Sequence, residues 1–472
     1  MVGKSTCQPC DSVYTCVRAR GYSFIFVRTP DRPYFVGRDV EKVRLPREIW
    51  VIVAASVAIS LGYGIVAPVL PRFAIQFGVT TTAATLVVSA FAFTRLAFAP
   101  AAGRLSGRLG ERRMYLLGIF IVAISSAASS VSQEYWHLLV LRGMGGFGSV
   151  MFSVAAMSLV IQLAPADARG RASAAFGGGY LVGNIAGPAL GALIAPLGYR
   201  WPFLIYAVML LISMAIVAYE IPADGHRRRK LREVWFKKNA HKTQPSADSF
   251  PEVAAAAAVG APDGRSVMSV SEAFQNPRFP LVLLTAFVQG WANMGMRVAV
   301  VPLLAGTIVA GPSWLPAGPW LAGGAMTAFA MGNVVSLLHA GRWTDVYGRR
   351  VVVLWGLLVS GVFTIALGFS VTSVSFLLMC FFGGLGGGFI QPAQQGAMAD
   401  IVGDRQGGRV VSFFQQFNDF GTILGPIIAG LIIDYSGYFT AYIVGGSVLI
   451  LAAFAWIFFD SKETDALQAA QK

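Results

Sequence analysis

Long apolar stretches, each bounded by a short polar segment, follow one another along most of the chain. An α-helix needs about 20 apolar residues to cross the hydrocarbon core of a bilayer. Helices are suited to this because they satisfy their own backbone groups. The pattern predicts twelve membrane-spanning helices, near residues 48–71, 81–102, 114–131, 136–163, 171–194, 201–219, 280–306, 318–340, 351–370, 374–400, 410–433 and 439–459.

Composition agrees with an all-α integral membrane protein. Of the 472 residues, 55% are hydrophobic and 13% are charged, whereas about a quarter are charged in a soluble domain. Glycine and proline recur inside the apolar stretches, as is common in membrane helices. A soluble fold is therefore excluded.

The position of the charges explains the formal net charge of +14. Most of the Lys and Arg residues lie in the two tails, the central loop and every second short loop, while the opposite loops carry Arg72 and Arg200. The positive-inside rule then predicts that both termini are cytoplasmic in a multi-pass protein of the inner or plasma membrane. The charge is a signal of topology, so we expect no nucleic-acid partner.

The sequence also contains an internal repeat. GRLSGRLGERR begins at Gly103, and the similar GRWTDVYGRR begins at Gly341, 238 residues later. Three other landmarks share this offset: Gly145-Gly146-x-Gly148, Gly170-Arg171 and the G-x-x-x-G-P that begins at Gly183. Two six-helix bundles in parallel repeat are typical of secondary transporters, with the substrate site between them near the bilayer midplane.

The predicted organisation has five parts. They are a cytoplasmic tail (1–47), a first bundle (48–221, the first half), a cytoplasmic linker (222–278), a second bundle (279–460, the second half) and a cytoplasmic tail (461–472). The linker contains the basic run HRRRKLREVWFKK. This run is either a solvated tether or an amphipathic segment on anionic lipid.

Four motifs resemble those of the major facilitator superfamily, in particular its twelve-span drug:proton antiporters. They are GRLSGRLGERR for the loop between spans 2 and 3, LGYGIVAPVLP for span 1, LRGMGGFG for span 4 and GNIAGPALGALI for span 5. Gly107 occupies a position that is acidic in the family's loop motif, and span 1 lacks an acidic residue that such antiporters often carry.

The resemblance implies a transporter and not an enzyme. It would export small amphiphilic organic compounds, with the proton gradient as its driving force, no cofactor or metal, and lipid and substrate as partners of a monomer. A metabolite or sugar transporter of the same fold, working by uniport, is the first alternative. A membrane sensor or enzyme is the second.

Several residues are candidates for gating the conformational change. Gly103 and Gly341 would let helix ends approach closely, while Gly110 and Gly348 would form tight turns. Asp345 is either a latch that breaks when the bundles move or part of a topology anchor. The small-residue motif of spans 5 and 11 is either a flexible seam between the halves or ordinary helix packing. The candidates are Gly103, Gly110, Asp345, Gly341, Gly348, Arg349, Gly183, Gly187, Pro188, Gly425 and Pro426.

Ionisable residues inside membrane spans are costly and therefore mark function. Asp419 lies about ten residues into span 11, roughly 15 Å along the helix and near the midplane. It is either the protonation site or one half of a permanent ion pair with Arg297 or Arg142. Arg142 matches the arginine of the span 4 motif, which the resemblance links to proton transfer.

Polar side chains cluster in spans 1, 7, 10 and 11. Residues 391, 394 and 395 have the spacing of one helical face. These groups either line a wet cavity for an amphiphilic solute or join helices to each other. The cavity candidates are Tyr63, Gln289, Trp291, Asn293, Arg297, Gln391, Gln394, Gln395, Gln415 and Asn418. Cys7, Cys10 and Cys16 lack the histidines of a zinc site, and we expect reduced thiols.

Overall fold

The computed structural model describes residues 14–19, 22–27, 45–164, 168–221, 268–308, 319–403, 405 and 408–470. The chain divides into two units, Met1–Arg44 and Leu45–Lys472, which are taken separately below. Most of the predicted linker and the residues Cys7 and Cys10 lie outside the described residues.

The first unit contains a β-hairpin that the sequence analysis did not predict. Strands β1 (Tyr14–Ala19) and β2 (Tyr22–Val27) pair in antiparallel fashion, with Tyr14 opposite Val27 and Ala19 opposite Tyr22. Cys16 lies in β1. Aromatic and β-branched residues, which favour strands, fill both segments. The prediction of an all-α chain is wrong for these two strands.

The rest of the described chain is helical. In the first half the helices are α1 (Arg47–Val66), α2 (Leu70–Ile75), α3 (Thr81–Leu109), α4 (Glu111–Ser130), α5 (Tyr135–Leu163), α6 (Arg169–Ile194), the short η2 (Ala195–Leu197) and α7 (Trp201–Glu220). In the second half they are α9 (Val270–Ala273), α10 (Arg278–Gly290), η3 (Trp291–Val300), α11 (Val301–Leu304), α12 (Pro319–Tyr347), α13 (Arg349–Gly368), α14 (Ser373–Val402) and α15 (Gly408–Ala470).

Within the described residues, 10 helices are long and apolar enough to cross a membrane. One of them, Arg409–Phe458, is 50 residues long and contains a non-helical residue, Gly437 (φ 81°), between the predicted spans 11 and 12. Helix α6 occupies the place of predicted span 5 but is not among the 10. Helices therefore occupy all the predicted places, while the number twelve stays a prediction.

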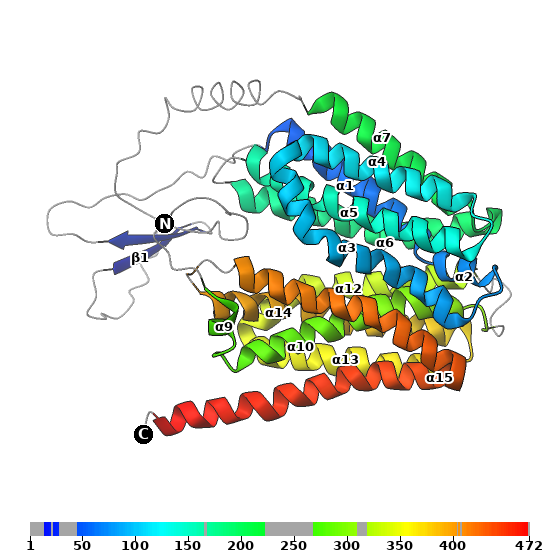
Figure 1. Ribbon diagram of the computed structural model, residues 1–472. Helices are drawn as coiled ribbons and strands as arrows, with labels where there is room; N and C mark the ends of the chain where they lie inside the picture. Colours follow the sequence, from blue (N-terminus) through cyan, green and yellow to red (C-terminus); the bar gives the residue numbers. More distant parts are fainter. Residues whose placement is uncertain are drawn as a thin grey trace. The chain divides into compact units, whose positions relative to one another are not determined.

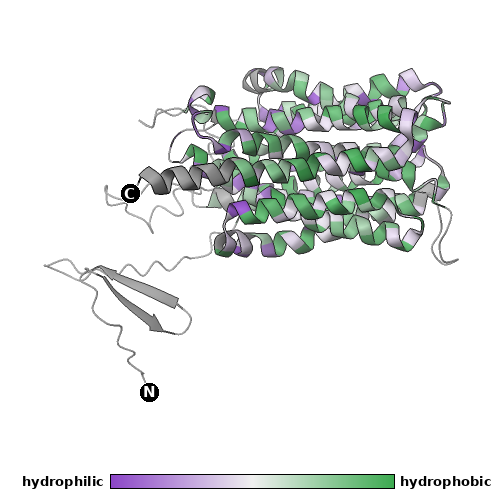
Figure 2. Ribbon diagram, turned by 90° about the horizontal axis from the view of Figure 1, so that it is seen from below, coloured by the Kyte–Doolittle hydropathy of each residue, from purple (hydrophilic) through white to green (hydrophobic). Residues whose placement is uncertain are grey.

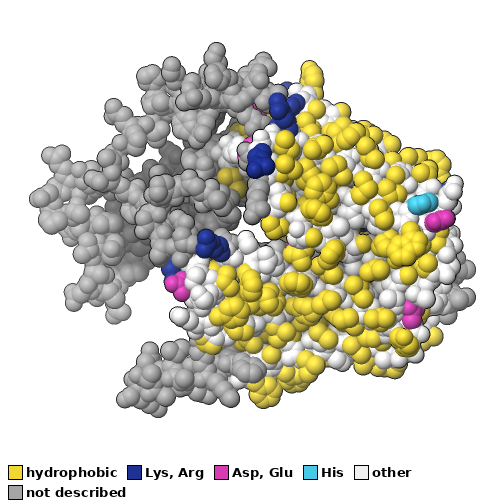
Figure 3. All heavy atoms as spheres, viewed as in Figure 1, with side chains coloured by type: hydrophobic (Ala, Val, Ile, Leu, Met, Phe, Trp, Pro, Cys, Tyr) yellow, Lys and Arg dark blue, Asp and Glu magenta, His cyan; other side chains and the backbone are white. Residues whose placement is uncertain are grey.

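Apolar side chains cover the outside of these helices. Hydrophobic residues dominate along the helix lengths in Figure 2. In Figure 3 they cover most of the described face, with the Lys and Arg side chains toward the end where α9 lies. Exposed side chains include Trp136, Leu338 and Trp355, each more than 60% accessible. A surface this apolar fits a lipid environment.

Helices pack mainly with others of their own half. In the first half α1 contacts α6 and α7, and α5 contacts α3 and α4; in the second half α14 contacts α12 and α13, and α15 contacts α10, η3 and α13. Between the halves, α3 lies against α15 and α6 against α12 (Figure 1). These last two pairs are where the halves meet.

Two repeated glycines form the predicted tight turns. Gly110 precedes α4 with φ 77°, and Gly348 precedes α13 with φ 80°. Positive φ is favourable only for glycine, so the turn prediction is confirmed. The close approach of helix ends predicted at Gly341 is not observed, because a Cβ there would meet no atom within 4 Å. Gly103 lies in α3, and its surroundings are outside the described part.

The small-residue motif joins helices within a half. A Cβ on Gly187 would lie 2.6 Å from Gly64 Cα of α1, and one on Gly425 would lie 2.9 Å from Gly295 Cα of η3. Gly183 also faces α1. These contacts are the ordinary helix packing that the sequence left open. The same motifs also meet the other half: Gly323 of α12 approaches the Pro188 carbonyl of α6, and the Ile423 carbonyl of α15 accepts a hydrogen bond from Ser89 of α3.

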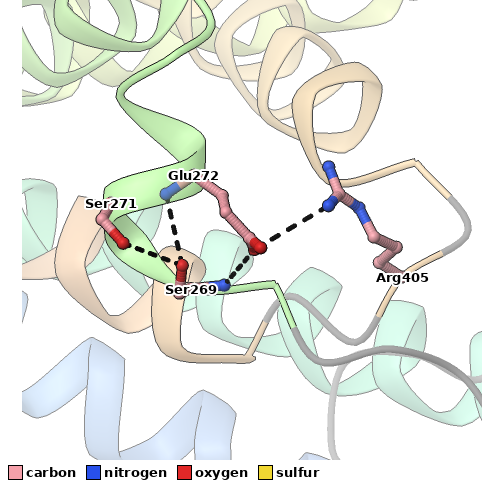
Figure 4. Close-up of polar contacts among 4 residues, drawn as sticks. All are labelled: Ser269, Ser271, Glu272 and Arg405. Carbon is pink, nitrogen blue, oxygen red and sulfur yellow. Dashed lines mark hydrogen bonds and ion pairs between the residues drawn. The ribbon is translucent and has the colours of Figure 1, made fainter.

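A short helix precedes α10 and occupies the end of the predicted linker. In α9, the Ser269 hydroxyl accepts from the Glu272 backbone N–H and the Glu272 carboxylate accepts from the Ser269 N–H, which is a capping box. Arg405, in the loop after α14, lies 3.8 Å from the same carboxylate (Figure 4). This ion pair thus links α9, at the start of the second half, to the loop after α14.

We predict that Gly187→Ala destabilises the protein by about 1–3 kcal/mol, because the methyl group would collide with the α1 backbone. Gly178→Ala is the matched control, since a Cβ at Gly178 of the same helix would meet nothing within 4 Å. Thermal unfolding in detergent should show a lower midpoint for the first variant only. Equal midpoints would contradict the close contact.

A second prediction concerns pH. Hydrogen bonds from Ser269 and, more weakly, the charge of Arg405 lower the pKa of the Glu272 carboxyl. The ionised form therefore stabilises α9 above the ordinary pKa of glutamate, about 4.3, and this contribution disappears as the pH falls through the lowered value. Hydrogen exchange of the α9 amides, corrected for intrinsic rates, should accelerate on acidification in the unmodified protein. Glu272→Gln should lack this pH response.

Candidate functional site

The predicted seventh span is interrupted where its polar residues lie. Helix α10 ends at Gly290, and a π-helix, η3, carries Trp291, Asn293 and Arg297 before α11 resumes the regular α-helix. π-helical turns are rare and frequently occur at functional sites. In transporters, interrupted helices supply the groups that bind the substrate. Trp291, Asn293 and Arg297 therefore lie in the least regular part of this span, while the fourth residue proposed from the sequence, Gln289, lies in α10.

A buried arginine, Arg142, and a partly buried one, Arg297, have matching surroundings in the two halves. The Arg142 Cζ lies 4.8 Å from the ring centre of Phe91, and the Arg297 Cζ lies 4.8 Å from that of Phe329. Phe329 follows Phe91 by the repeat offset of 238 residues. Each half thus holds a guanidinium against the same repeated aromatic ring, an interaction worth roughly 0.5–2 kcal/mol.

The arginines themselves come from different helices. Arg142 belongs to α5, and the residue 238 positions later is Cys380 of α14. Cys380 is buried and lines a small cavity together with Arg297, Phe329 and Tyr442. The second half therefore keeps a positive charge at the repeated ring but supplies it from η3.

The Nε atom of each arginine lacks a hydrogen-bond partner among the described residues. Arg142 is 3% exposed, and both Nε atoms are buried. No described carboxylate forms an ion pair with either guanidinium. Tyr63 of α1 lies close enough to interact electrostatically with both. Its ring centre is 5.9 Å from that of Phe91.

The cavity beside Arg297 is too small for an organic solute. Its volume is about 30 Å³, which accommodates roughly one water molecule. The buried hydroxyl of Tyr442 also has no described partner there. A larger hollow of about 540 Å³, between α13 and α14, is lined mainly by apolar residues such as Val362, Ile365 and Met379, and none of the arginines lines it.

Asp419 has a different neighbour from those weighed in the sequence analysis. It lies partly buried in α15, where the Gln415 side chain hydrogen-bonds to it and Arg95 of α3 interacts with it electrostatically. The permanent ion pair with Arg142 or Arg297 is absent from the described residues. Since Arg95 and Asp419 belong to different halves, the interaction crosses the contact between α3 and α15.

The amides proposed from the sequence could either line a cavity or join helices to each other. Asn418 donates to the Ala286 carbonyl of α10 at 3.1 Å, so it joins helices. Gln394 is 2% exposed, whereas Gln391 and Gln395 are exposed, so the three amides of this helical face differ in solvent access. Gln289 and Asn293 are partly buried, and Trp291 is buried with its Nε1 unpartnered among the described residues.

Repeated contacts occur at the arginine-rich end, where residues 103–113 and 341–350 lie. Arg349, at the start of α13, pairs with the Asp400 carboxylate and the Gly396 carbonyl of α14. In the first half, Gln162 of α5 donates to Glu111 at the start of α4 at 2.8 Å, and these two positions are the repeat counterparts of Asp400 and Arg349. Asp345 lies in α12, with its side chain outside the described part.

Hydrogen bonds join the halves at the opposite end, where α3 begins and Gly437 lies. Asp434 of α15 accepts from the backbone N–H groups of Thr81 and Thr82 at 2.9 and 2.8 Å, and from the Thr82 hydroxyl at 2.6 Å. Arg72 Nε donates to the Pro302 carbonyl at 2.6 Å. Deeper along α3, the Ser89 hydroxyl donates to the Ile423 carbonyl at 2.7 Å.

Sequence analysis did not identify several of these residues. Phe91 and Phe329 looked like ordinary apolar residues, and the repeat offset was the signal that could have paired them. Asp434 directly follows predicted span 11, a position that gives no sign of its partners. No local pattern identifies its partners, because Thr81 and Thr82 are more than 350 residues away in the chain.

Comparison with known proteins identifies the family. A model of the Major Facilitator Superfamily matches residues 52–326 and 319–472. The chain is 23% identical to the quinolone resistance protein NorA of Staphylococcus aureus (strain COL) over 396 residues, which cover 82% of this chain and 90% of NorA. It is 28% identical to an uncharacterized MFS-type transporter of Mycobacterium tuberculosis over 189 residues, covering 40% of this chain and 32% of that protein.

Solved structures agree at the level of the fold. The crystal structure of a POT family transporter in complex with 5-aminolevulinic acid is similar with a TM-score of 0.68 and 13% identity, over 88% of this chain and 96% of that one. The family model covers nearly the whole helical part of the chain, so the resemblance noted in the sequence is confirmed. The chain belongs to the Major Facilitator Superfamily and is a multi-pass membrane transporter.

Proposed function

We propose that this transporter exports small amphiphilic organic compounds by proton antiport, with alternating access between two six-helix bundles. The similarity to a quinolone resistance protein supports drug efflux. The observation that carries the proposal is the Arg95–Asp419 interaction, because it places a titratable carboxylate at the contact of the two halves.

Proton coupling follows from the position of Asp419. Its charged form is favoured while Arg95 is near and disfavoured when the carboxylate is surrounded by apolar groups. A relative movement of α3 and α15 would change the distance between the two groups. Asp419 would then bind a proton in one conformation and release it in the other.

Alternating access requires contacts that break reversibly. The bonds of Asp434 to the start of α3 and of Arg72 to Pro302 hold the halves together at the opposite end. With cytoplasmic termini, as the distribution of charge predicts, this closed end faces outward. Release of substrate would require these bonds to open.

We predict that Asp419→Asn abolishes transport driven by a proton gradient while exchange of substrate across the membrane continues. Proteoliposomes and the fluorescent quinolone norfloxacin measure both activities. Glu134→Gln is the matched control, since Glu134 is an exposed carboxylate that precedes α5 at the opposite end. Gradient-driven transport by Asp419→Asn would remove this residue from the coupling mechanism. Transport by the unmodified protein without any response to the gradient would favour uniport.

We also predict that Asp434→Ala opens the outward-facing end. Loss of its hydrogen bonds should shift the conformational equilibrium by roughly tenfold, since bonds to a charged group contribute about 1.5–3 kcal/mol. The readout is the rate at which a membrane-impermeant maleimide labels Thr85→Cys, a position that is fully buried in the closed end. Glu134→Ala at the same end should leave the labelling rate unchanged. An unchanged labelling rate in Asp434→Ala would show that the Asp434 hydrogen bonds do not hold this end closed.

A further inference from the structure

The charges within the membrane spans do not balance. Arg95, Arg142 and Arg297 lie inside candidate spans, and Asp419 interacts electrostatically with Arg95. Among the described residues no carboxylate forms an ion pair with Arg142 or Arg297, and the Nε atom of each lacks a hydrogen-bond partner. A buried charge without a partner costs several kcal/mol.

The interactions that are present do not offset this cost. Each guanidinium gains roughly 0.5–2 kcal/mol from its phenylalanine ring. Tyr63, which interacts with both, is a phenol and supplies no carboxylate. Proton transfer offers no explanation either, because arginine remains protonated in proteins. Both residues therefore have unused capacity to bind an anion.

The position of these groups suits a shared ligand. Arg142 belongs to the first half and Arg297 to the second, and Tyr63 of the first half interacts electrostatically with both. Aromatic rings flank the charges, with Phe91 beside Arg142, Phe329 beside Arg297 and Trp291 in the same π-helix. Guanidinium groups favour carboxylates and related oxyanions, while the rings favour an apolar body.

We propose that the substrate is an amphiphilic organic anion, whose acidic group binds to Arg142 and Arg297 and whose apolar part packs on Phe91, Phe329 and Trp291. This inference rests on the proposed function and narrows its substrate class. The cavity beside Arg297 holds about one water molecule in the conformation described, so the apolar part of the anion would enter only after the surrounding helices have moved apart. Because the two arginines belong to different halves, one bound anion would neutralise both.

A series of ligands that share one ring system and differ in charge tests the inference. The probes are radiolabelled 1-naphthylacetate, 1-naphthylacetamide and 2-(1-naphthyl)ethylamine, measured by counterflow in proteoliposomes that contain the full chain without a proton gradient. We expect the anion to exchange about tenfold or more faster than the amide and the amine. Arg142→Gln and Arg297→Gln should each reduce this preference about tenfold or more, whereas Arg297→Lys should retain part of it.

Arg200→Gln is the matched control, because Arg200 lies outside the cavity and donates to the Ser132 carbonyl. It should leave the preference for the anion unchanged. Monodisperse elution and an unchanged unfolding temperature would establish that each variant folds.

The outcomes separate this inference from the proposed function. Equal exchange of the three probes, preferred exchange of the amine, or no exchange of any of them would overturn the anion inference. Norfloxacin transport by the same proteoliposomes would still support the proposed function in each case. Absence of norfloxacin transport would instead count against the proposed function, even if the naphthyl anion were exchanged.

Discussion

A guanidinium or carboxylate inside the hydrocarbon core of a bilayer must be compensated by another group, and Arg95, Arg142, Arg297 and Asp419 lie within candidate spans, away from their ends. These four side chains have two kinds of surroundings. Arg95 and Asp419 interact across the contact between the halves, while the other two arginines lie over phenylalanine rings. A relative movement of the halves would therefore change the surroundings of these charged side chains. This links the two-bundle fold to the proposed transport cycle.

The repeat explains why the surroundings of the charges can be alike while their chemistry differs. Glycine turns, close helix contacts and the ring that receives a guanidinium recur at an offset of 238 residues. The ionisable groups do not follow the repeat, because Cys380 stands where the first half has Arg142. Arg349 and Asp400 likewise form an ion pair where the first half has Glu111 and Gln162. Duplicated scaffolding therefore supports distinct roles in the two halves.

The helical fold could be predicted from the sequence, because the hydrocarbon core of the bilayer limits the length and polarity of each membrane-spanning helix. Gly110 and Gly348 were also readable, since a glycine between two helices indicates a left-handed turn. The π-helix at Trp291–Val300 could not be predicted in this way. It packs against α15, a helix that is distant in sequence. The partners of Asp419 and Asp434 were missed for a similar reason: both lie on α3, which is far away in sequence and becomes adjacent only in the folded chain.

The most direct test of this account is a pair of distances between the halves in lipid nanodiscs. Spin labels at the exposed residues Trp201 and Phe369 would report on the opposite end, and labels at Tyr219 and Tyr347 on the arginine-rich end. On changing the pH or adding substrate, the account predicts that one distance lengthens while the other shortens. Distances that stay fixed, or that lengthen and shorten together, would contradict a charged site that opens alternately to the two sides.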